Sequence, residues 1–142
     1  MNQSSKAREE RHCFPALRRV RSSADFRRCQ QSGRRLHTPH FVLVVYARGD
    51  REPARLGLTV SRRVGNAVAR NRMKRLLREV FRTGAHWPEG VDLVIIAKRG
   101  PADLTAQRIA AELDTSREAL SKRVAQARRD AEKRPPKLAS PG

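Results

Sequence analysis

The sequence predicts an α+β sandwich: a small, mostly antiparallel sheet of about four strands, with helices on one side and an open face on the other. Short segments rich in β-branched and aromatic residues have the length of strands, and longer segments have the apolar spacing of amphipathic helices. One strand segment alternates between large apolar and small or polar residues, which is typical of a sheet covered on one face. A single core suits the length of 142 residues.

We expect one folded domain at residues 14–131. A basic tail at 1–13 and a Pro- and Lys-rich tail at 132–142 hold too little apolar surface to offset chain entropy, and both are predicted to be disordered. The N-terminal segment lacks the apolar stretch of an export signal, and the longest apolar run, 41–47, is much shorter than a membrane-spanning helix. A cytoplasmic protein without a membrane partner is expected.

The first predicted helix covers 24–31. Ser22 and Ser23 can cap its start, because a serine oxygen accepts hydrogen bonds from the free N–H groups of the first turn, and Gly33 can end it. The segment 41–47, Phe-Val-Leu-Val-Val-Tyr-Ala, is too short for a typical helix and is predicted to be a strand buried on at least one face.

A loop at 48–53 is predicted to return the chain into a second strand at 55–61. This strand has two different faces: Leu56, Leu58 and Val60 on one, and Arg55, Gly57, Thr59 and Ser61 on the other. The first face belongs to the core. The second is small and polar, and such a face is either solvated or a platform for a nucleic-acid strand.

A strongly amphipathic helix is predicted from Asn66 to about Arg82. Its buried arc contains Ala69, Met73, Leu76, Leu77, Val80 and Phe81. A further strand follows at 91–97. The chain is then expected to end in one long, mostly charged helix that starts near Asp103 or Thr105 and continues to about Ala131.

The charge of the chain indicates a polyanionic partner. There are 32 Lys and Arg residues against 14 Asp and Glu, a formal net charge of +18, and this self-repulsion opposes folding unless a polyanion relieves it. No acidic residue lies between Glu52 and Glu79. Solvated helix faces usually mix both signs, whereas the outer arc of the amphipathic helix is almost purely cationic, which favours phosphate binding. That arc contains Asn71, Lys74, Arg75, Arg78 and Arg82.

The segment before this helix predicts a second phosphate site. Arg62 and Arg63 lie next to Gly65, which permits a close approach of the backbone, and Asn66 can act as the N-cap. Free N–H groups at a helix start beside two arginines suit a phosphate.

Catalytic and metal-binding patterns are absent from the sequence. The histidines are scattered, and no carboxylate or histidine spacing suits a metal ligand set. Cys13 and Cys29 are predicted to be reduced thiols. We therefore assign no catalytic residue. His37 and His40 are the remaining candidates for proton transfer, and ordinary surface histidines are the favoured interpretation.

Three consecutive runs resemble the bacterial ribonuclease P protein family, whose hallmark is an Arg-Asn-Arg helix. They are Arg55–Arg63, Gly65–Val68 and Arg70–Glu79. Ala24-Asp25-Phe26 and Gly33 upstream, and 92–97 with Lys98 downstream, agree with this resemblance, which covers roughly Phe14 to Val124.

The resemblance implies that a separate catalytic RNA removes the 5′ leader of precursor tRNA with magnesium, and that the protein binds both this RNA and the leader. It implies no cofactor bound to the protein and no obligatory protein partner. It also implies a ribosomal-protein-S5-like sandwich with a left-handed crossover from the Arg55 strand to the Val91 strand, although such crossovers are generally right-handed.

The resemblance further implies two sets of site residues. Those that face the catalytic RNA are Arg62, Arg63, Asn66, Arg70, Asn71, Arg72, Lys74, Arg75 and Arg78. Those in the leader cleft, between the first helix and the open sheet face, are Phe26, Gln30, Val42, Val44, Thr59 and Ser61. Family members often carry aromatic residues at the positions of Gln30 and Val44, so base stacking is expected to be reduced here, with charge and Phe26 more important.

Two other interpretations remain. A generic basic RNA-binding protein of ribosomal type fits the charge and the tails equally well, and only the Gly-Asn to Arg-Asn-Arg signature argues against it. A helix-turn-helix DNA-binding protein would need a second short helix before the basic one, which the sequence does not predict.

Overall fold

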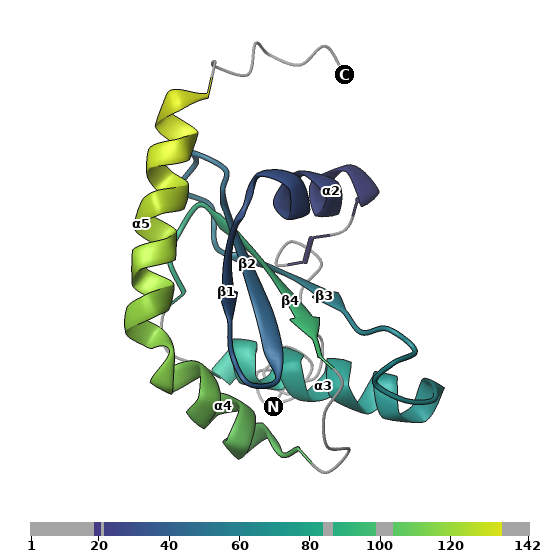
Figure 1. The fold of residues 1–142 in the computed structure, drawn as a ribbon. Coiled ribbons are helices and arrows are strands. Elements are labelled where there is room, and N and C mark those ends of the chain that lie inside the picture. The colour runs from purple at the N-terminus through teal and green to yellow at the C-terminus, as the bar shows by residue number, and fades with distance from the viewer. Residues whose placement is uncertain (1–18, 21, 84–86, 99–103, 135–142) are drawn as a thin grey trace, which may run out of the picture.

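The computed structural model describes residues 19–20, 22–83, 87–98 and 104–134. Most of the two predicted tails lies outside these ranges. Within them the chain forms the predicted α+β architecture (Figure 1). The elements in chain order are α2 (Ser23–Ser32), β1 (Arg34–His37), β2 (Phe41–Ala47), β3 (Arg55–Thr59), α3 (Ala67–Thr83), β4 (Val91–Ala97), α4 (Ala106–Thr115) and α5 (Arg117–Lys133).

The four strands form one sheet in the order β1-β2-β4-β3. β2 is antiparallel to both β1 and β4, whereas β3 is parallel to β4. The sheet is therefore mostly antiparallel, as predicted. α3 connects the two parallel strands, and the left-handed sense expected for this crossover stays a prediction.

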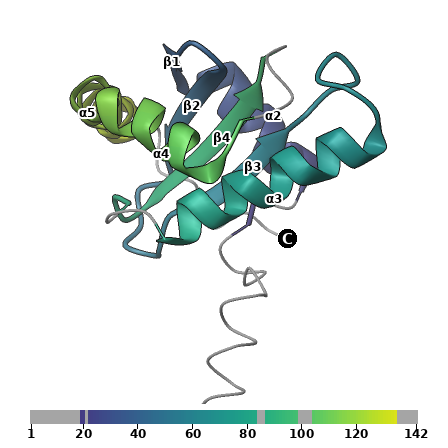
Figure 2. The ribbon, with the colours of Figure 1, turned by 90° about the horizontal axis from the view of Figure 1, so that it is seen from below.

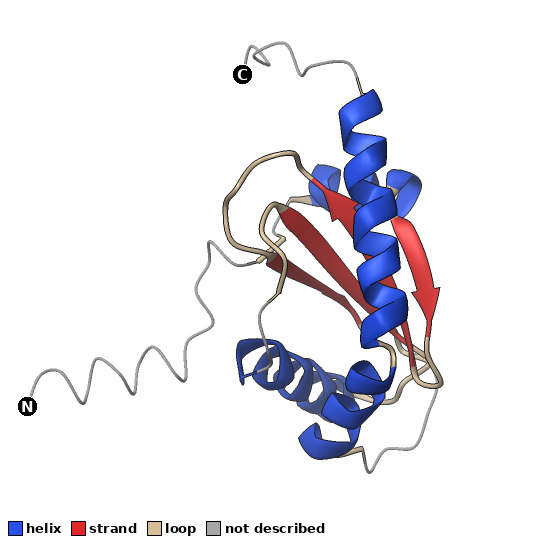
Figure 3. Cartoon of the chain, turned by 90° about the vertical axis from the view of Figure 1, so that its left-hand side faces the viewer, coloured by secondary structure: helices blue, strands red, loops and turns tan. Residues whose placement is uncertain are grey.

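Helices lie on both faces of the sheet (Figure 2). α3, α4 and α5 cover the main core, where Phe41, Leu43 and Ile95 are almost completely buried. α5 runs along β2 and β1 (Figure 3). The Asp130 carboxylate of this helix pairs with Arg34 Nε of β1 at 2.7 Å. The expectation of helices on one side holds for these three helices, whereas α2 packs on the opposite face.

α2 closes part of the face that was expected to be open. The Cys29 side chain of this helix packs with Val42, Val44, Tyr46 and Val94 of the sheet in a second, smaller apolar cluster. All seven residues of β2 are consequently buried, and Val42, at 9% exposed, is the one with the most accessible surface. What remains open is the part of the sheet beyond α2.

The predicted caps are present. Ser22 Oγ accepts a hydrogen bond from Asp25 N at 3.0 Å, and Asn66 Oδ1 accepts one from Ala69 N at 2.9 Å. The Gly33 N–H donates to Cys29 O at 2.8 Å and ends α2. Caps of this kind contribute about 1 kcal/mol each.

Three details of the secondary structure differ from the sequence prediction. β3 ends at Thr59 and not at Ser61, and β1 was not predicted, because Arg-Arg-Leu-His has little apolar content. The expected single C-terminal helix is wrong: α4 and α5 meet at Ser116. The Ser116 hydroxyl donates to Glu112 O at 3.2 Å, and its backbone leaves helical geometry, since serine side chains compete for backbone groups.

One carboxylate is buried on the α2 side of the sheet. Asp92 is 2% exposed. Arg55 donates to it twice, from Nε at 2.8 Å and from Nη2 at 2.7 Å, and Arg48 Nη1 is a further donor. Arg55, predicted on the small polar face of its strand, therefore has a structural partner, and the buried charge is compensated by two guanidinium groups.

Candidate nucleic-acid interface

α3 divides into an apolar and a cationic side, as its sequence predicts. Met73, Leu77, Val80 and Phe81 are buried against the sheet. Because one helical turn takes 3.6 residues, the polar residues between them fall on the solvent side. We call the following set the basic surface, since all its members are exposed: Arg62, Arg63, Asn66, Asn71 and Arg75.

The loop before α3 holds the first part of the basic surface close to the helix start. Gly65 has a φ of 153°, and a Cβ atom there would lie 2.9 Å from the Ala69 side chain. Only glycine fits without a shift, so the backbone can turn sharply into the helix. The turn places Arg62 and Arg63, both exposed, a few residues before the first turn of α3, and two arginines next to a helix start suit a phosphate.

The other predicted RNA-binding residues of α3 are half-buried: Arg70, Arg72, Lys74 and Arg78. Arg72 Nη2 donates to Leu104 O at 3.0 Å and so links α3 to the start of α4. Burial, followed by the positive charge of Arg19, lowers the pKa of the Arg78 guanidinium. Positive charges that repel each other in this way favour a bound anion.

The acidic residue of α3 does not neutralise the basic surface. Glu79 accepts hydrogen bonds from Arg82 at 2.7 Å and 2.8 Å, and both side chains lie near the C-terminal end of the helix. The pair therefore removes Arg82 from the predicted cationic arc, whereas Asn71 and Arg75 remain available.

Strand register defines the open part of the sheet on the α2 side. The residues His37, Val42, Ile96 and Thr59 are direct partners across the four strands, and we call them the open row. His37 is exposed, Ile96 and Thr59 are half-buried, and Val42 is 9% exposed. Directly opposed residues share a face, so these four side chains form one continuous floor.

The neighbouring row lies beneath α2. It consists of Arg35, Val44, Val94 and Gly57. Both valines are 0% exposed. The ring of Phe26 lies over Gly57, where a Cβ atom would come within 2.9 Å of it. α2 thus borders the open row along one side. Phe26 and Gln30 of this helix are both half-buried there.

The predicted leader residues differ in how accessible they are. Val44 has no exposed surface for RNA, because it is packed against Cys29 beneath α2. Phe26, Gln30, Val42 and Thr59 surround or form the open row, and Ser61 is exposed just after β3. Their contact with a leader stays a prediction. Sequence reasoning missed His37 because strand β1 gave no clear signal, and it missed Ile96 because the place of β4 between β2 and β3 is not visible in the sequence.

His40 and Glu112 are in contact, and their contact has a structural role. Glu112 Oε1 lies 2.5 Å from His40 Nδ1, and its Oε2 accepts from Thr38 Oγ1 at 2.6 Å and from His40 N at 2.9 Å. Burial would raise the pKa of Glu112, but the hydrogen bonds from Thr38 and His40 outweigh it and lower the pKa. These contacts fasten the β1–β2 hairpin to α4.

Cys29 is the cysteine that the structure describes. Cys29 is completely buried, and desolvation, followed by the charges of Asp92 and Asp25, raises the pKa of its thiol to about 12. A thiol of this kind is inert. Cys13 lies outside the described residues. In the ranges that the structure covers, no three His, Cys, Asp or Glu side chains could hold a metal ion, and no helix is long and apolar enough to cross a membrane.

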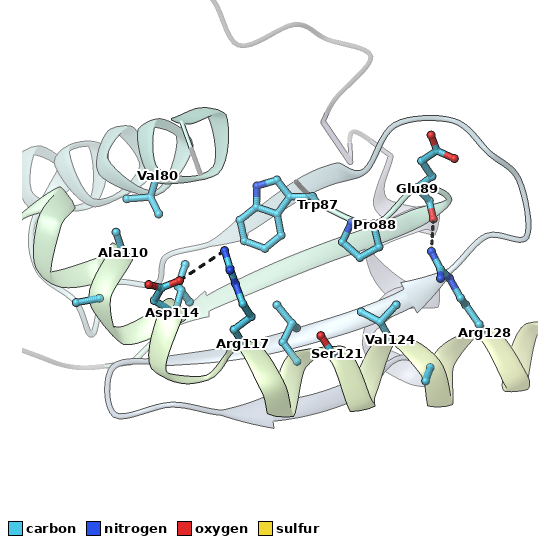
Figure 4. A pocket seen from close by; sticks show the side chains of 14 residues that line it. Val80, Trp87, Pro88, Glu89, Ala110, Asp114, Arg117, Ser121, Val124 and Arg128 are labelled. Atoms are coloured by element: carbon cyan, nitrogen blue, oxygen red, sulfur yellow. Dashed lines mark hydrogen bonds and ion pairs between the residues drawn. The ribbon is translucent and has the colours of Figure 1, made fainter. Parts of the chain in front are cut away.

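A hollow of about 1170 Å³ lies between the end of α3, Trp87 and helices α4 and α5 (Figure 4). Its walls are mainly apolar. Its charged groups include both signs: Arg117 pairs with Asp114 at 3.6 Å, and Arg128 Nη2 donates to the backbone oxygen of Glu89 at 3.1 Å. Its mainly apolar, mixed-charge lining differs from the cationic basic surface.

Comparison with known proteins agrees with this geometry. The family model for Ribonuclease P matches residues 14–124. A ribonuclease P protein component from Desulfovibrio desulfuricans is 46% identical over 109 residues, covering 72% of this chain and 82% of the relative. One from Geotalea uraniireducens is 38% identical over 109 residues, covering 77% and 96%.

Solved structures show the same fold. The RNase P protein of Staphylococcus aureus superposes with a TM-score of 0.66 at 30% identity, over 75% of this chain and 97% of that protein. The RNase P protein of Thermotoga maritima gives a TM-score of 0.62 at 28% identity, over 75% and 96%. From its basic helix, its sheet and these relatives, the chain belongs to the ribonuclease P protein family.

Proposed function

We propose that this protein binds the catalytic RNA of ribonuclease P through the basic surface and the 5′ leader of precursor tRNA through the open row. The observation that carries this proposal is that the two surfaces lie on opposite faces of one sheet. α3 packs on one face with its cations outward, and α2 borders the open row on the other. One small domain can therefore contact two RNA molecules at once.

The basic surface suits a folded RNA. The guanidinium groups of Arg62, Arg63 and Arg75 can each bind two phosphate oxygens, and Asn71 can donate to or accept from a ribose or base edge. The backbone that carries these side chains is held in a helix and a tight turn, so RNA binding requires ordering of the side chains but not of the backbone.

Cleavage itself is assigned to the RNA subunit. Magnesium is proposed to act on that RNA. The close histidine–carboxylate pair described above, His40 with Glu112, is assigned the structural role of holding the β1–β2 hairpin to α4. The role of the protein is to reduce repulsion between two polyanions and to hold the leader, which lowers the magnesium concentration that the reaction needs. We propose that it does so in the cytoplasm.

The test is reconstitution with purified components. The protein is added to a ribonuclease P RNA and a precursor tRNA, and cleavage is followed over a series of magnesium concentrations. We expect no cleavage by the protein alone and a clear stimulation of the RNA at low magnesium. Magnesium-dependent cleavage by nuclease-free protein without RNA would contradict the proposal. Equal affinity for unrelated structured RNAs would favour a general RNA-binding protein.

A further inference from the structure

The open row places an exposed histidine at the end of a floor that crosses the whole sheet. His37 is the partner of Val42, which is the partner of Ile96, which is the partner of Thr59. With strands about 4.8 Å apart, this row is roughly 15 Å wide. Its two central side chains are apolar and form a low surface, whereas its two ends are polar.

The imidazole of His37 does not take part in holding the fold together within the described residues. It is exposed and makes no hydrogen bond or ion pair there, in contrast to His40, which is fixed by Glu112. The neighbouring row is also occupied: Arg35 Nη2 donates to Gln30 O at 3.3 Å and links β1 to α2. His37 is therefore the planar side chain on the β1 border of the floor that is available to a ligand.

A second planar group lies on the opposite border. The ring of Phe26 sits over Gly57 of β3, at the other end of the sheet. A single-stranded RNA offers flat base faces that stack on aromatic rings, histidine included, and apolar residues such as Val42 and Ile96 are compatible with bases between them.

We propose that His37 stacks on a base of the single-stranded 5′ leader, as the β1-side counterpart of Phe26. This inference rests on the proposed function and names a further binding residue on the same surface. The position of Val44 cannot serve, because it is buried beneath α2. A residue of the edge strand thus supplies a ring where the buried centre of the sheet does not.

The experiment measures the affinity of the reconstituted holoenzyme for precursor tRNA and for mature tRNA, and takes their ratio. His37→Ala is expected to reduce this ratio by about 5-fold to 30-fold, from the loss of one exposed base stack. His37→Phe should keep the ratio within about threefold of the unmodified protein, since stacking needs the ring and not its charge. Gln107→Ala, an exposed polar position on α4 across the sheet, is the matched control and should change nothing.

His37→Lys separates stacking from charge. It should behave like His37→Ala. If it keeps the ratio while His37→Phe loses it, His37 contacts a phosphate and the stacking proposal is overturned.

The two levels of the proposal fail in different ways. An unmodified holoenzyme that prefers the leader, with His37→Ala preferring it equally, overturns the role of His37 alone. An unmodified holoenzyme with no preference for the leader overturns the proposed function of the open row. Because His37 is exposed, unchanged thermal unfolding of each variant is expected and is measured beside the binding.

Discussion

The two faces of the sheet are stabilised in different ways. On the α3 side, a large apolar core from three helices buries residues such as Phe41 and Leu77 almost completely. On the α2 side, a smaller apolar cluster lies beside a buried carboxylate held by two arginines. The α3 side can therefore carry unpaired cations outward without loss of packing, whereas the α2 side depends on a few specific contacts and is easier to perturb.

The largest expected effect concerns the buried carboxylate. Asp92→Ala should destabilise the protein by about 3 kcal/mol, because Arg48 and Arg55 would lose the buried carboxylate and keep only the more exposed carboxylates of Asp50 and Asp25. Denaturant unfolding measures the change. The exposed pair of Asp114 and Arg117 provides the control, and Asp114→Asn should cost no more than about 1 kcal/mol. Equal costs would mean that the α2 side does not depend on Asp92.

The next effect tests whether the α2 face binds the leader, by comparing precursor tRNA with mature tRNA. Phe26→Ala should weaken binding of precursor tRNA by about 1–3 kcal/mol and leave mature tRNA nearly unchanged, since one base stack is lost. Binding of both tRNAs and thermal unfolding are measured together. An early-unfolding variant that loses both tRNAs equally would show that Phe26, packed on Gly57, serves only the fold.

Thr59→Glu tests the same face without removing any packing. Thr59 is half-buried in the open row, and a carboxylate there would lie beside the leader phosphates. Weaker binding of precursor tRNA than of mature tRNA is expected. A stable variant with unchanged leader preference would place the leader elsewhere.

On the α3 side, Arg75 and Arg72 should behave differently although both belong to the predicted set. Arg75→Ala removes an exposed cation, so it should weaken binding of the catalytic RNA and reduce the slope of log affinity against log salt by about 0.9, with stability unchanged. Arg72→Ala also removes the hydrogen bond to Leu104 O, which should lower stability by about 1 kcal/mol. Salt titrations and denaturant unfolding of both variants check this. Identical behaviour would refute the division.

The smallest effect is on the pH dependence of stability. The pKa of Glu112 is lowered in the folded protein from its ordinary value of 4.5. Its contribution to stability is therefore present above that value and is lost as the pH falls through the folded pKa. Glu112→Gln should flatten the acid side of a plot of unfolding free energy against pH. An unchanged acid limb would mean that the contacts to Thr38 and His40 are not linked to folding.

Sequence reasoning was most successful where a pattern repeats within one element. The period of α3 gave its buried arc, and the serine and asparagine caps gave the starts of α2 and α3, because these signals depend on neighbouring residues only. The short strand β1 was missed, since its pairing with β2 depends on residues distant from one another along the chain and its own composition is charged.

The candidate site was predicted less completely for the same reason. Val44 is predicted to contact the leader, but it is buried because α2 packs over it. The position of α2 on the sheet cannot be inferred from neighbouring residues in the sequence. The hydrogen bond from Arg72 to Leu104 O joins residues far apart in the sequence. The break between α4 and α5 depends on the backbone conformation of Ser116, which the charged sequence around it does not predict.

Gly57 determines how closely α2 packs on the sheet. Phe26 approaches so closely that a single added carbon at this position would meet the ring at 2.9 Å. The height of α2 above the sheet is therefore set by an atom that is missing from β3. A side chain introduced at position 57 would push α2 away from the sheet and change the width of the open row beside it. The α3 side of the sheet would keep its geometry.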